Sequence, residues 1–139
     1  MKYTDEDKII LDVLEALQDT IIEKSNGDIS QDEIRVHGYY DSPDSISLMC
    51  KTGIVSTIGS TQEKINVEFY VNVNTSLLYV TIRKILRIVN SIKRINTIKF
   101  DITHLKLIEP PVVVREMLDK NFVRYRFAYE LMFSRITAA

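Results

Sequence analysis

The stretch Ile65–Val73, which reads INVEFYVNV, decides the fold, because its apolar and polar residues alternate without a break. Successive side chains of a strand point to opposite faces, so the odd-numbered positions would face a core and the even-numbered ones, Asn66 to Asn72, would face outward. Asn74-Thr75-Ser76 follows directly and supplies residue types that cap helices. A helix to about Ile92 or Arg94 would place its apolar residues on one stripe. These positions are Leu78, Ile82, Ile85, Val89 and Ile92.

The flanking segments show the same two periods. Thr4 to Glu23 predicts an amphipathic helix with Thr4 as its N-cap and acids in its first turn. Its apolar stripe consists of Ile10, Val13, Leu14, Leu17 and Ile21. Further strands are predicted at 34–40, 45–52, 97–108 and 122–136, with a bulge or bend at Thr103-His104. The predicted breaks are a turn at Asp41–Asp44, a loop or flexible hairpin end at Gly53–Lys64, and a loop at Val112–Asn121 after Pro110-Pro111 ends its strand.

The order of these segments predicts an α+β fold, α-β-β-β-α-β-β. Strands joined by connections of hairpin length favour a mainly antiparallel sheet, and two helices with one apolar face each would pack on one side of it. A length of 139 residues fits a single domain over 1–139.

Composition excludes several classes of protein. Hydrophobic residues make up 45% and charged residues 27%, which is typical of a folded globular chain. One cysteine allows neither an intramolecular disulfide nor a multi-cysteine zinc site. No apolar run is long enough for a transmembrane helix, and the acidic start of the chain does not resemble a signal peptide.

The two parts of the chain carry opposite charge. Residues 1–44 hold four basic and twelve acidic residues, a net of −8, whereas residues 45–139 hold fourteen and seven, a net of +7. This pattern fits a dipolar surface that meets a partner, a neighbouring copy or nucleic acid. It equally fits two solvated helix faces that differ in sign by chance.

Catalytic and ligand-binding motifs are missing from the sequence. No glycine-rich phosphate loop is present. His37 and His104 are the only histidines and stand far from Cys50, which falls on the apolar side of its strand. We therefore expect a protein that is not an enzyme, with no catalytic residues, no metal and no cofactor.

The whole pattern resembles the tail terminator, or tail-completion, proteins of long-tailed bacteriophages, and the neck proteins that join tail to head look similar. The segments that carry the resemblance are Ile65–Val73 leading into Thr75–Ile92, and the closing strand Phe122–Ile136 with the loop before it. In that strand bulky residues alternate with arginine, as in Val123-Arg124-Tyr125-Arg126-Phe127.

The resemblance implies a homo-oligomeric ring, usually a hexamer, that caps the tail tube and docks onto the head connector. Its partners would be further copies of itself, the tail tube protein and the connector or neck proteins. It would lie in the virion after assembly in the host cytoplasm, with no membrane contact. It implies neither catalysis nor a cofactor.

A ring suggests a contact between the opposite charges of neighbouring subunits. The candidate interface residues are Asp12, Glu15 and Asp19 on one side and Arg83, Arg87, Arg94, Arg124 and Arg126 on the other. The basic residues would alternatively line a channel for passing DNA. Two other functions stay open: a small adaptor that binds one protein partner, and a nucleic-acid-binding protein with a basic helix.

Overall fold

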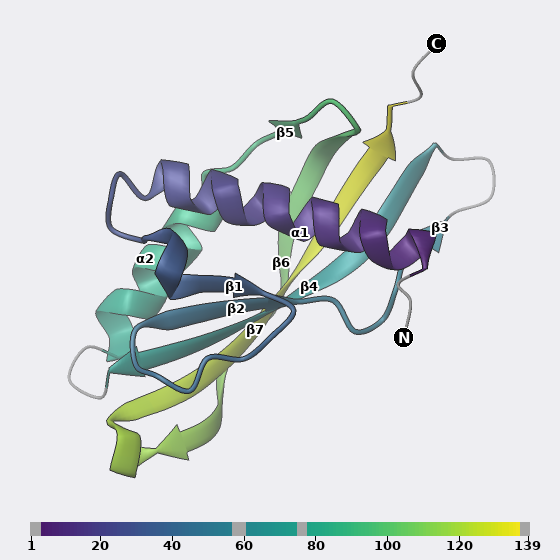
Figure 1. Ribbon diagram of the computed structural model, residues 1–139. Coiled ribbons are helices and arrows are strands. Elements are labelled where there is room, and N and C mark those ends of the chain that lie inside the picture. The colour runs from purple at the N-terminus through teal and green to yellow at the C-terminus, as the bar shows by residue number, and fades with distance from the viewer. Residues whose placement is uncertain (1–3, 57–60, 75–77, 137–139) are drawn as a thin grey trace.

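The computed structural model describes residues 4–56, 61–74 and 78–136 (Figure 1). Two α-helices, seven strands and two 3₁₀ turns make up this part of the chain. In chain order the elements are α1 (Asp5–Lys24), η1 (Gln31–Glu33), β1 (Ile34–Val36), β2 (Ser45–Met49), β3 (Val55–Ser56), β4 (Gln62–Asn74), α2 (Leu78–Asn90), β5 (Ile95–Asn96), β6 (Phe100–Met117), η2 (Leu118–Lys120) and β7 (Phe122–Arg135).

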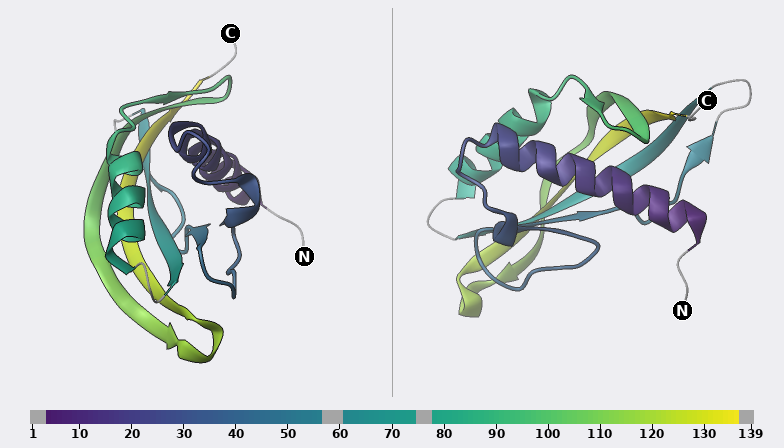
Figure 2. Two further views of the ribbon diagram at one scale, coloured as in Figure 1. Left: turned by 90° about the vertical axis from the view of Figure 1, so that its left-hand side faces the viewer. Right: turned by 45° about the horizontal axis from the view of Figure 1, so that its top comes forward.

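The strands form one sheet in the order β1-β2-β4-β7-β6-β5, with β3 paired to β4. Every neighbouring pair is antiparallel except β1 and β2, which run parallel. The sheet is curled, and both helices pack against its concave face (Figure 2). The predicted α+β class and the α-β-β-β-α-β-β order are confirmed, with β3 and β5 as short additions.

Helix α1 begins and packs as its sequence predicts. The Thr4 hydroxyl accepts from the backbone N–H of Asp7, and the Asp7 carboxylate accepts from the backbone N–H of Thr4. This reciprocal cap satisfies two backbone donors that a helix start leaves free. All five residues of the predicted stripe are buried: Ile10, Val13, Leu14, Leu17 and Ile21.

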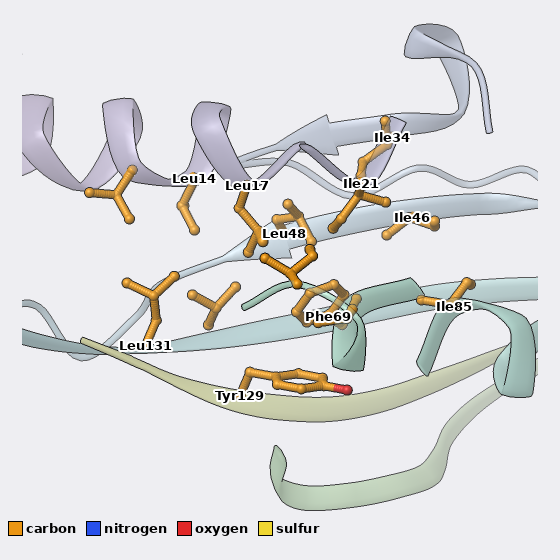
Figure 3. Packing of buried hydrophobic residues seen from close by; sticks show 14 of the residues in the cluster. Leu14, Leu17, Ile21, Ile34, Ile46, Leu48, Phe69, Ile85, Tyr129 and Leu131 are labelled. Atoms are coloured by element: carbon orange, nitrogen blue, oxygen red, sulfur yellow. The ribbon is translucent and has the colours of Figure 1, made fainter. Parts of the chain in front are cut away.

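The core lies between the helices and the two central strands (Figure 3). Strands β4 and β7 pair over thirteen residues, from Gln62↔Ser134 to Asn74↔Phe122. Phe69 on β4 stacks on Phe127 of β7 with ring centroids 4.9 Å apart, and Tyr129 packs beside Phe69. Leu17 of α1 and Ile85 of α2 belong to the same buried cluster, so both helices close one core.

The prediction that Pro110-Pro111 ends a strand is wrong. Strand β6 continues through both prolines to Met117, and the predicted loop Val112–Asn121 is strand followed by the turn η2. Proline lacks a backbone N–H, but an edge strand tolerates it where no neighbour needs that donor. The predicted bulge is confirmed, because the pairing register shifts between Ile102 and His104.

Two other boundaries also differ from the prediction. The strand predicted at 34–40 ends at Val36, because His37 adopts a positive φ of 54°, which leaves the extended region. The segment Gly53–Lys64, predicted as a loop or a hairpin end, contains β3, which pairs antiparallel with β4, and β4 already begins at Gln62. The predicted cap of the second helix includes Thr75 and Ser76, which lie outside the described residues.

Candidate subunit interface

Two of the three predicted acids on α1 are exposed and unpaired. Within the described residues, neither Glu15 nor Asp19 forms a hydrogen bond or an ion pair. Asp12 differs, because its carboxylate accepts from the Lys99 Nζ at 3.2 Å and its side chain is only 37% exposed. The negative surface of α1 available to a partner is therefore centred on Glu15 and Asp19.

Helix α2 carries a positive surface. Arg83 and Arg87 are exposed one helical turn apart, and no carboxylate in the described part of the chain pairs with either guanidinium. They border an open hollow of about 560 Å³ with Leu86, Asn90 and Ser91. The Asn90 Oδ1 accepts a hydrogen bond from the hydroxyl of buried Tyr129 at 2.7 Å, which ties one residue that lines this hollow to the core.

Arg94 is engaged within its own chain. Its Nε and Nη2 donate to the two carboxylate oxygens of Asp101 at 2.8 and 2.7 Å. These bonds raise the pKa of Arg94 and lower the pKa of Asp101. A bidentate pair of this kind holds the guanidinium in one place. Arg94 is thus less available to a neighbouring subunit than Arg83 or Arg87.

Arg124 is buried, although strand alternation places it on the outer face. Its Nε donates to Asn72 Oδ1 at 2.8 Å, and its Nη2 donates to the Tyr40 carbonyl at 2.5 Å and to Asp41 at 3.1 Å. The loop 37–44 folds over this part of the sheet and covers it. Asn72, predicted to face outward, is buried for the same reason.

Arg126 lies in an ion-pair network on the outer face. Its guanidinium donates to Glu109 and to Glu68. Both hydrogen bonds raise the pKa of Arg126, and the bond to Glu109 has the larger effect. Tyr70 donates its hydroxyl proton to Glu68 at 2.5 Å and accepts from Lys51 at 3.1 Å. Tyr70 points to the outer face as predicted, but other residues cover it there and only 9% of its surface is exposed.

The histidine, cysteine and acidic side chains that could bind a metal or take part in catalysis do not cluster in the described part of the chain. No group of three histidine, cysteine or acidic side chains in the described ranges could hold a metal ion. His104 sits half-buried at the bulge, its Nε2 3.3 Å from Glu130, and His37 is exposed in a loop. Burial raises the pKa of the Cys50 thiol, which favours the unreactive protonated form.

No helix in the described part of the chain is long and apolar enough to cross a membrane. No protein-family model matches the sequence, and no curated protein is significantly similar to it.

Sequence reasoning missed one surface of the molecule. Ile108, Val112, Val113 and Val114 are exposed on β6, where a loop was predicted for three of them. The run of three valines was the available signal, since β-branched residues favour strands. The pairing of Arg124 with Asn72 left no such signal, because it depends on a loop folding back.

Proposed function

We propose that this chain is a structural virion protein that assembles into a ring, closes the tail tube of a long-tailed bacteriophage and joins it to the head connector. In this proposal the chain is not an enzyme and uses no cofactor. Its partners are copies of itself, the tail tube protein and the connector or neck proteins. The proposal rests on the order of elements described above and on one feature of the surface.

That feature is the pair of unmatched charges on the two helices. Glu15 and Asp19 on α1, and Arg83 and Arg87 on α2, have no partners in the described chain. The two helices lie on one face of the sheet with their axes in different directions (Figure 2). Opposite charges at different places on one subunit allow a head-to-tail contact, which closes into a ring when the rotation between subunits permits.

Charge reversal tests this contact. The double variants E15K/D19K and R83E/R87E should each lower the association constant by about tenfold or more, because like charges then face each other. The quadruple variant restores opposite charges and should recover assembly. Asp32→Lys and Lys120→Glu, exposed charges elsewhere, serve as controls. Unchanged assembly of both double variants would contradict the proposal.

The hollow beside Arg83 and Arg87 supports a second candidate, contact with DNA. Two arginines without acidic partners suit the phosphate backbone, and such binding would weaken steeply with salt. The two functions predict different results for the quadruple variant. Assembly is restored in that variant, but DNA affinity stays low because the positive charges on α2 are gone.

A further inference from the structure

Strand β6 leaves one side of its backbone open. Strand β7 pairs with it along its length, but β5 covers only Asp101 and Ile102 on the other side. Within the described residues no strand pairs with the outer edge of positions 103–117. The opposite end of the sheet is more protected, since β1 has three residues and its Ile34 carbonyl accepts from the Gln18 side chain at 2.8 Å.

This open edge is also apolar. Among the described residues, four of the eight exposed large hydrophobic side chains lie on it: Ile108 at 38%, Val112 at 50%, Val113 at 48% and Val114 at 45%. An unpaired strand edge is a template for another strand, and native proteins normally protect it. Pro110, Pro111 and the register shifts limit pairing here, but Val112–Val114 stay exposed beside them.

The segment from Glu109 to Arg115 is symmetric about Val112 in its pairing with β7. Glu109, Val112 and Arg115 lie opposite Ala128, Arg126 and Arg124, alternate residues of β7, so the three share the outer face of the sheet. Between Glu109 and Arg115 one register shift falls on each side of Val112, and the two further shifts of β6 lie before Glu109. A second copy running the other way therefore presents the same spacing.

Reversal about Val112 also matches the charges. It places Glu109 of each copy opposite Arg115 of the other, twice in one contact. Arg115 has no ion-pair partner within the described residues. Glu109 already binds Arg126, but its side chain is 51% exposed. Opposite charges directly across a strand pair are favourable, and the apolar residues between them would lose contact with water.

We propose that two copies of this chain pair antiparallel along β6, with a two-fold axis at Val112. The contact extends the sheet from one subunit into the other. It is distinct from the helix contact of the proposed ring, because it involves a different element and is two-fold. It would join two subunits, or two rings face to face, and it does not depend on the ring.

Disulfide trapping tests the axis directly. In a Cys50→Ser background, Val112→Cys places the new thiol of one subunit beside the same thiol of the other subunit. Directly opposite residues of a strand pair have Cβ atoms about 4.5–5.5 Å apart. We expect oxidation at low protein concentration to give covalent dimers at least tenfold faster than with Val55→Cys. Val55 is the matched control, because it is 51% exposed on the short strand β3. Equal rates for the two variants would overturn the proposal.

The charges provide a second test of the same contact. Adding Arg115→Glu to Val112→Cys should slow cross-linking about tenfold, and adding Glu109→Arg as well should restore it. Circular dichroism shows whether each variant is folded. Cross-linking unaffected by Arg115→Glu would overturn the assigned register. The E15K/D19K variant should lose the helix contact of the proposed ring but keep the β6 pairing. Cross-linking through Val112→Cys should therefore persist in that variant, which separates the two contacts.

Discussion

Arg124 and Asn72 lie directly opposite each other on β7 and β4, and both are buried. The Arg124 Nε donates to Asn72 Oδ1, while the Asn72 amide donates to the carbonyls of Tyr40 and Ser42. The pair therefore fastens the loop 37–44 to the outer face of the sheet. An arginine that strand alternation assigns to solvent is instead part of the fold.

Removing this arginine should destabilise the protein strongly. Arg124→Ala leaves the buried Asn72 Oδ1 without its donor and removes one of the two donors to the Tyr40 carbonyl, so we expect a loss of about 3 kcal/mol in the free energy of unfolding. Urea denaturation measures it. The control is Arg135→Ala at the end of β7, which breaks an ion pair with Glu63 of β4 at the surface and should cost under about 1 kcal/mol. Equal losses for the two variants would contradict this role.

The aromatic contact at the centre of the core should contribute more. Phe69 is fully buried and stacks on Phe127. Phe69→Ala removes the ring and leaves a cavity, which typically costs about 3–5 kcal/mol. Exposed Val55 provides the comparison, since Val55→Ala should change stability by less than about 0.5 kcal/mol. If Phe69→Ala and Val55→Ala unfolded at the same urea concentration, Phe69 would not be at the centre of the core.

Tyr129 should make the protein less stable at alkaline pH. Burial raises the pKa of Tyr129 to about 12, against about 10 in an unfolded chain. Because the folded state holds this proton longer, its stabilising effect is complete below pH 10 and is lost as the pH rises towards about 12. Ultraviolet titration should show a late tyrosine that disappears in Tyr129→Phe. An unchanged titration curve would contradict this assignment.

Glu68 should have the opposite pH dependence. Burial acts to raise its pKa, but hydrogen bonds from Tyr70 and Arg126 and the charges of Arg126 and Lys51 outweigh it and lower the pKa. A lowered pKa stabilises the fold above the ordinary value of about 4.3, and this effect is lost as the pH falls further. Glu68→Gln should reduce the loss of stability between neutral and acidic pH. A loss as steep as that of the parent protein would exclude Glu68 as a contributor.

Sequence periodicity was sufficient for the elements that bury one face. All five stripe residues of α1, from Ile10 to Ile21, are buried as predicted. The strand predicted from Phe122 to Ile136 ends one residue early, at Arg135. These segments succeed because burial against one core imposes a regular period on the sequence.

Sequence periodicity gave wrong predictions in two places: where a loop covers the outer face of the sheet, and at the edge strand β6. Alternation assigns Arg124 and Asn72 to solvent, but the loop 37–44 covers them. Proline usually ends a strand, but at Pro110-Pro111 the pairing with β7 shifts register, and no strand among the described residues bonds the outer edge of β6. Of the predicted interface residues, Arg94, Arg124 and Arg126 bind acids of their own chain, which no local pattern could show.

The solution mass of the purified protein tests the central claim most directly. Light scattering after size exclusion, over a range of concentrations, reports how many 16.1 kDa chains associate. The account predicts a mass that rises to about six copies, or to about twelve where β6 joins two rings, as closed symmetric assemblies require. A mass that stays at one copy, or stops at two, at every concentration would contradict the ring.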